Sequence, residues 1–77
     1  MILKYKRLNR LSYRQLAEAF SQAARAPVTG ATVCNWARGK YPPSLLYMRE
    51  LARGAEGGLR ELALAVLAEL EGEHDKK

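Results

Sequence analysis

The segment from Val28 to Gly39, which reads V-T-G-A-T-V-C-N-W-A-R-G, constrains the fold of this chain more than any other stretch. Thr29 can accept a hydrogen bond from a free amide in the first turn of a helix. Gly39 tolerates the left-handed conformation that commonly ends helices. The segment therefore predicts a short helix over residues 29–38. Because a helix of this length is marginal alone, neighbouring elements must hold it in place.

The two faces of this helix differ in chemistry. Val33 and Trp36 are three residues apart and share one face, which we expect to be buried. At about 100° per residue, the opposite face carries Ala31, Cys34, Asn35 and Arg38. A methyl, a thiol, a carboxamide and a guanidinium suit contacts with base edges and phosphates. The same residues would also suit the solvent side of an ordinary core helix, and this segment alone leaves both interpretations open.

Length and charge narrow the choice of function. The chain has 77 residues and a net charge of +5, which indicates one domain without room for a deep catalytic cleft. Residues 1–49 contain nine Lys and Arg but a single acid, Glu18, whereas residues 50–77 contain four basic and seven acidic residues. A basic first half favours a polyanionic partner on one face. A merely solvated basic surface is the alternative.

Several classes of protein are disfavoured. Cys34 is the sole cysteine, so no internal disulfide can form, and Cys34 with His74 gives too few ligands for a zinc site. No nucleophile–base pair or carboxylate cluster is placed to converge, so we expect no enzyme, cofactor or small-molecule substrate. No apolar run of about 18 residues and no signal peptide are present, so we expect no membrane partner and a cytoplasmic location.

Four further helices are predicted from capping and periodicity. Residues 2–8 are expected to form a short basic helix, followed by a break at Asn9 and Arg10 because Asn tolerates the left-handed conformation. Ser12 and Gln15 have the spacing of a capping box for a helix that reaches about residue 24, and Pro27 ends this segment. Ser44 follows two prolines and caps a helix over 45–53, and the last helix covers about 59–71.

Apolar spacing predicts which side chains of the last two helices are buried. In the helix over 45–53 the inward positions are Leu45, Met48, Leu51 and Ala52. In the last helix one broad stripe consists of Leu59, Leu62, Ala63, Val66, Leu67 and Leu70, with Leu64 outside it. This stripe either completes the core or also packs on a second copy of the chain.

Taken together, three blocks of the sequence resemble the helix-turn-helix domain of phage repressors and Cro-like regulators, the Xre-type or lambda-repressor-like family. They are L-S-Y-R-Q-L-A-E-A-F at 11–20, V-T-G-A-T-V-C-N-W-A-R-G-K at 28–40 and P-S-L-L-Y-M-R-E-L-A at 43–52. The resemblance implies a compact all-α, five-helix domain over 1–72, followed by a charged flexible tail at 73–77. It also implies that the helix over 29–38 enters the major groove while the preceding helix crosses the DNA backbone.

Two features depart from the family pattern. Residues 21–27 extend the connection between the two helices, which family members keep short, so the angle between them is open. The positions that commonly read bases are Gly30 and Ala31. Ala31 can at most touch a thymine methyl group, which shifts base reading to Asn35 or indicates low specificity.

We therefore expect a sequence-specific double-stranded DNA-binding transcriptional regulator, a repressor of phage origin. The expected base contacts are Ala31, Cys34 and Asn35, and the expected DNA backbone contacts are Tyr13, Arg14, Thr29, Thr32, Arg38, Lys40 and Tyr41. The expected assembly is a homodimer or higher homo-oligomer through the last helix. The alternatives are a DNA-recognition subunit of a phage packaging or excision machine, and a protein-interaction module.

Overall fold

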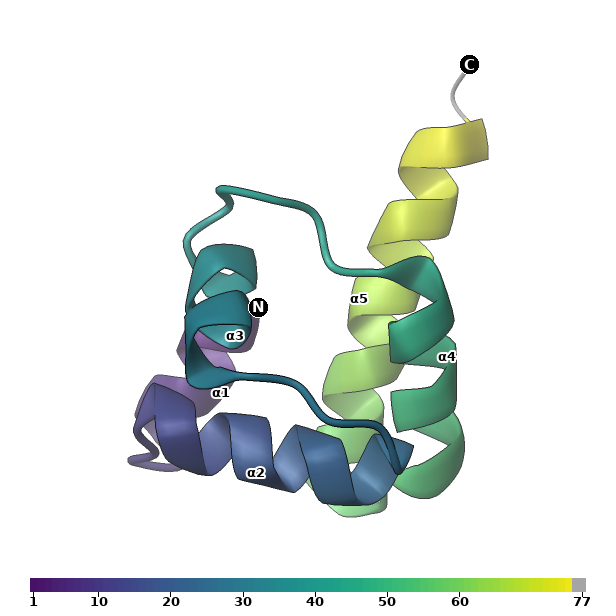
Figure 1. The fold of residues 1–77 in the computed structure, drawn as a ribbon. Helices are drawn as coiled ribbons and strands as arrows, with labels where there is room; N and C mark the ends of the chain where they lie inside the picture. The colour runs from purple at the N-terminus through teal and green to yellow at the C-terminus, as the bar shows by residue number, and fades with distance from the viewer. Residues whose placement is uncertain (76–77) are drawn as a thin grey trace.

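The computed structural model describes residues 1–75, with side chains through Gly72, and over this range it consists of five α-helices without a strand. The helices are α1 (Ile2–Leu8), α2 (Tyr13–Ala24), α3 (Gly30–Ala37), α4 (Leu45–Gly54) and α5 (Gly57–Asp75) (Figure 1). The predicted all-α, five-helix organisation is therefore confirmed.

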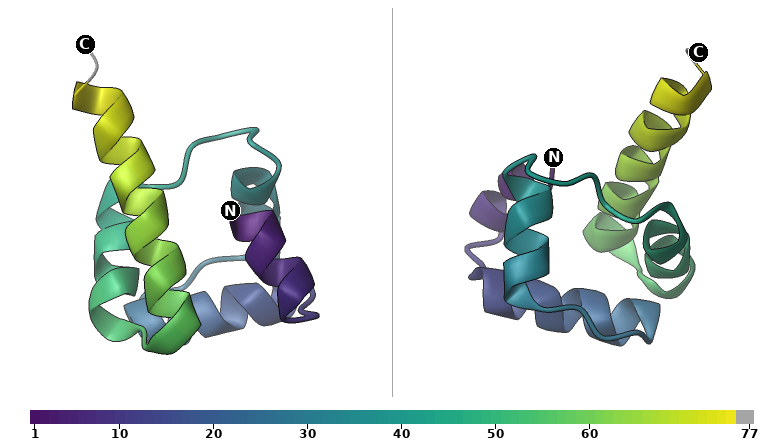
Figure 2. Two further views of the ribbon diagram at one scale, coloured as in Figure 1. Left: turned by 180° about the vertical axis from the view of Figure 1, so that it is seen from behind. Right: turned by 45° about the horizontal axis from the view of Figure 1, so that its top comes forward.

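Helix α2 runs across one side of the molecule, and the other four helices lie on the same side of it (Figure 1). Helices α1 and α3 pack together at its N-terminal end, and α4 and α5 form an antiparallel pair at its C-terminal end (Figures 1 and 2). The segment between α3 and α4 spans the distance between these two pairs on the side away from α2. The molecule measures 35 × 24 × 21 Å along its principal axes.

The predicted N-terminal caps are all present. The Ser12 hydroxyl accepts from the amide of Gln15 (3.1 Å), while the Gln15 side chain accepts from the amide of Ser12 (2.9 Å), which completes a capping box. Thr29 caps α3 by accepting from the amide of Thr32 at 3.1 Å. Ser44 caps α4 in the same way. These bonds are local, so the sequence was sufficient to predict them.

Helices α1 and α2 end at Leu8 and Ala24 as predicted, but the residues at which the chain leaves each helix differ from the prediction. The left-handed residue after α1 is Arg10 (φ 53°) and not Asn9, which has a φ of −98° and whose side-chain amide donates to the carbonyl of Tyr5 at 2.9 Å. The left-handed Arg25 (φ 55°) ends α2 two residues before Pro27. Gly39 has the expected positive φ of 76° after α3.

Helix α5 is longer than predicted at both ends. It begins at Gly57 rather than Leu59, and it continues to Asp75 rather than stopping at Glu71. The predicted tail therefore overlaps the helix, and its last two residues, 76 and 77, lie outside the described part.

The core lies where the helices meet above α2. Its largest fully buried side chains are Phe20, Leu16, Met48, Leu51 and Val33. The predicted stripe of α5 contributes four buried residues, Leu62, Ala63, Val66 and Leu67, and Leu64 lies outside it as expected. Leu59 and Leu70, at the two ends of the stripe, are half-buried against this core. The α5 stripe thus completes the core of the monomer.

Leu45 was predicted to be buried, and this is wrong because 37% of its surface is exposed. It belongs to the first turn of α4, whereas α2 passes α4 at the opposite end, beside Gly54 (Figure 1). No helix in the described range is both long and apolar enough to cross a lipid bilayer.

Candidate nucleic-acid interface

The first turns of α2 and α3 lie side by side. A Cβ atom added to Gly30 would be 3.4 Å from the backbone nitrogen of Arg14 and 3.5 Å from the carbonyl carbon of Tyr13. First-turn amides have no partners within their own helix, and neither of these first turns contains an acidic side chain. The positive ends of two helix dipoles therefore face the same neighbourhood, which suits an anionic partner.

The extended connection between α2 and α3 folds back along α2. The Ser21 hydroxyl accepts from the amide of Val28 at 3.0 Å and donates to the carbonyl of Val28 at 3.3 Å. The Tyr47 hydroxyl of α4 donates to the carbonyl of Ala26 at 2.9 Å. Burial raises the pKa of Tyr47 above its usual 10.0, and the nearby Ser21 hydroxyl offsets part of this rise. The connection thus returns α3 to the beginning of α2.

The rotation of α3 agrees with the predicted helical phase. Val33 is completely buried, and Ala31 and Arg38 on the opposite side are exposed. Asn35 lies between these two on the same outward stripe, but it is half-buried, as is Cys34 at the edge of the stripe. The outward stripe of α3, defined here as Ala31, Asn35 and Arg38, contains no acidic side chain.

The two threonines at the beginning of α3 are bonded to each other. Their hydroxyl oxygens, Thr29 Oγ1 and Thr32 Oγ1, are 3.0 Å apart, and Thr29 Oγ1 also accepts from the amide of Thr32. Each hydroxyl has one proton, and the bond between them uses only one of the two protons. One proton of the pair is left for an external acceptor such as a phosphate oxygen.

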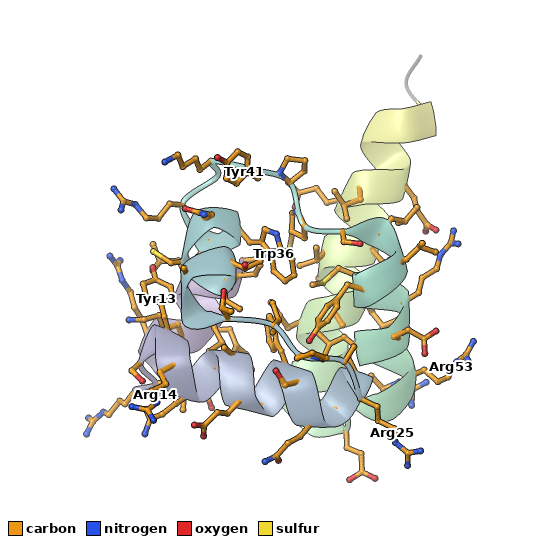
Figure 3. The ribbon with its side chains drawn as sticks, in the orientation of Figure 1. Tyr13, Arg14, Arg25, Trp36, Tyr41 and Arg53 are labelled. Carbon is orange, nitrogen blue, oxygen red and sulfur yellow. The ribbon has the colours of Figure 1, made fainter. Side chains whose placement is uncertain are left out.

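The beginning of α2 brings together Arg14, Tyr13 and a residue that the sequence did not single out, Lys6. The Arg14 side chain is 90% exposed, with its Nε atom 3.9 Å from a carboxylate oxygen of Glu18. An exposed ion pair of this length contributes little, so the guanidinium can turn to another anion. Figure 3 shows Arg14 and Tyr13 at this end of α2, next to α3.

The Tyr13 side chain, one of the expected DNA backbone contacts, is half-buried against the core, whereas that of Arg14 is exposed. The Nζ atom of Lys6 lies 4.6 Å from the centre of the Tyr13 ring, within the range of a cation–π contact. The packing of α1 on α3 brings Lys6 here. The basic sequence at residues 4–7 was the signal available, but it did not indicate which cation would lie at the interface.

Trp36 was expected to be a core residue, and it is only half-buried. Figure 3 shows its side chain directed from α3 toward α4 and α5. Its ring packs against that of Tyr47, with ring centres 5.6 Å apart and a tilt of 57°. Beyond the end of α3, Lys40 and Tyr41 are exposed on the segment that leads to α4.

Three other cations, on α4 and at the end of α2, lie away from this surface. Arg25 and Arg53 lie at the opposite end of α2 (Figure 3), and Arg49 contacts Glu71 of α5 at 3.5 Å. Among the described residues no group of His, Cys, Asp and Glu side chains is arranged to hold a metal ion. The candidate interface is therefore the outward stripe of α3 with the adjoining first turn of α2.

No protein-family model, curated protein or solved structure matches this chain.

Proposed function

We propose that this chain is a cytoplasmic, sequence-specific double-stranded DNA-binding transcriptional regulator, a repressor of the helix-turn-helix type. The observation that carries the proposal is the outward stripe of α3, which lacks acids and adjoins the acid-free first turn of α2 with its exposed Arg14. An α-helix with its side chains is about 10–12 Å across, and the major groove of B-DNA is about 12 Å wide. Helix α3 therefore enters the major groove, while the beginning of α2 faces the phosphates beside it.

The side chains divide into phosphate contacts and base contacts. Arg14, Arg38 and Lys40 supply charge for phosphates, and the threonine pair and the two tyrosines, Tyr13 and Tyr41, supply hydroxyl groups. Asn35 pairs in a bidentate manner with an adenine, Ala31 contacts a thymine methyl group, and Cys34 lies beside them. Gly30 lets the backbone of α3 approach the DNA closely.

A salt titration tests whether the basic surface binds DNA. Replacing Arg14, Arg38 or Lys40 singly by Gln should reduce the slope of log affinity against log salt concentration by about one for each lost phosphate contact. Arg25→Gln and Arg53→Gln are matched controls because these cations lie at the other end of α2. Equal slopes for the wild type and the three interface variants would reject the DNA-binding surface proposed here.

Base reading needs a separate test, because phosphate contacts are independent of sequence. Asn35→Ala should cost about 1–3 kcal/mol on the preferred site and remove the preference at one base pair. The preferred site comes from selection of bound sequences out of random DNA. A uniform loss of affinity on every sequence would make Asn35 a phosphate contact, contrary to its assignment.

The proposed regulator is a homodimer that assembles through α5. The observation that supports an additional contact is the exposure of two leucines outside the core, with Leu46 on α4 71% exposed and Leu64 on α5 48% exposed. These exposed side chains also suit a DNA-recognition subunit of a larger machine. The mass in solution distinguishes them, because a regulator forms dimers and a ring-forming subunit forms larger assemblies.

A further inference from the structure

A groove of about 330 Å³ lies between the end of α3 and the C-terminal half of α5, on the far side of α3 from its outward stripe. Met1 and Ile2 at the beginning of α1 complete its walls, together with Gly39 and residues 41–43. The buried side chains of Ile2 and Val66 provide apolar surface, and the half-buried Leu70 adds to it. The volume is at the lower end of the range of small-molecule sites, which is about 300–1,000 Å³.

The chemistry of the walls favours a positive charge in the occupant. Trp36 and Tyr41 contribute aromatic rings, whose faces attract cations. Glu69 is the one lining residue with a charged side chain, and within the described range neither a Lys or Arg side chain nor the N-terminal amine of Met1 forms an ion pair with it. The end of α3, represented here by Ala37 and Gly39, is the negative end of a helix dipole.

We propose that this groove binds a small organic cation, a molecule with an apolar or single-ring aromatic body and one ammonium group. The body lies against Val66 and Leu70, and the ammonium group lies near Glu69 and the aromatic rings. The inference is independent of DNA binding, because none of the groove residues except Tyr41 belongs to the proposed DNA interface.

The test is a titration with three probes of similar size, namely 2-phenylethylamine, 2-phenylethanol and 3-phenylpropionate. Trp36 is the sole tryptophan of the chain and lines the groove, so its fluorescence reports occupancy directly. The amine should bind about three to five times more tightly than the alcohol, and the carboxylate should bind most weakly.

Two variants locate the charge effect. Glu69→Gln should remove most of the preference for the amine, about a threefold loss of its affinity, without changing the affinity for the alcohol. Glu61→Gln is the matched control, because Glu61 is exposed on the same helix but does not line the groove. The preference for the amine should be unchanged in this control.

Three results would overturn the proposal. Equal binding of the three probes would show an apolar groove without selectivity for charge. An unchanged preference for the amine in Glu69→Gln would place the cation elsewhere. A Trp36 signal that changes with protein concentration in parallel with a doubling of mass, but not with the probes, would show that a second copy of the chain covers the groove.

Discussion

Gly54 of α4 lies directly against the backbone of α2, and it offers a sharp test of the arrangement of the helices. A Cβ atom built on Gly54 would be 1.7 Å from the carbonyl oxygen and 2.8 Å from the carbonyl carbon of Ala23. Real Cβ atoms essentially never approach another atom closer than 3.0 Å. Because the obstacle is backbone, no side-chain rotation can relieve it, and one helix must move by about 1.3 Å.

The expected cost follows from the kind of obstacle. Overpacking against movable side chains typically costs about 1–3 kcal/mol. A clash with a helix backbone leaves less scope for relaxation, so we expect Gly54→Ala to lower the free energy of unfolding by about 2–4 kcal/mol. A chain of 77 residues has a total stability of about 4–12 kcal/mol. The melting temperature should fall by about 10–25 °C.

The assay is thermal and urea unfolding followed by the far-ultraviolet circular dichroism of the helices, with two control substitutions. Gly72→Ala meets nothing within 4 Å inside α5, so helix propensity should raise the stability by up to about 1 kcal/mol. Gly39→Ala also meets nothing, but its φ of +76° should cost about 1–2 kcal/mol. If Gly54→Ala does not lower the melting temperature while Gly72→Ala raises it, α2 and α4 are not packed as described.

Three further predictions concern the residues around α3. Trp36→Ala should lower the free energy of unfolding by about 2–4 kcal/mol in urea unfolding, less than for a fully buried tryptophan, and an unchanged stability would contradict its packing on Tyr47. The half-buried Cys34 should react with a small alkylating reagent without denaturant, and bound DNA should slow the reaction; a thiol that reacts only in denaturant would reject the assigned rotation of α3. Because burial raises the pKa of Tyr47 in the folded state, its stabilising effect should be complete below pH 10 and lost as the pH rises through the folded-state pKa. Tyr47→Phe should cost about 1 kcal/mol at pH 7 and remove this alkaline loss, as unfolding measured at a series of pH values would show.

The features that the sequence predicted well are local along the chain. The caps at Ser12, Thr29 and Ser44 each involve a hydroxyl and an amide three residues later, so their spacing is visible in the sequence. The rotation of α3 followed from the helical period once Val33 was taken as buried. The glycine after α3 has the positive φ that its position required.

The features that the sequence did not predict depend on which helix lies opposite. Leu45 has the spacing of a core residue, but α2 crosses α4 too far away to cover it. The Tyr13 side chain packs partly against the core, and its ring contacts the ammonium group of Lys6, because α1 packs on α3 beside it. The Trp36 side chain remains partly exposed because a groove lies between it and α5. None of these relations is contained in the period of a single helix.

The extended connection between α2 and α3 illustrates how tertiary bonds can preserve an arrangement that sequence spacing leaves open. A longer connection alone would allow α3 to begin almost anywhere near the end of α2. The two hydrogen bonds between Ser21 and Val28, and that between Tyr47 and Ala26, fix the returning chain against α2 and α4. Since Gly30 then lies against the backbone of Arg14, α3 begins beside the first turn of α2. Residues 21–27 therefore lengthen the C-terminal end of α2 and form the returning loop. The N-termini of α2 and α3, on which the proposed phosphate contacts depend, remain adjacent.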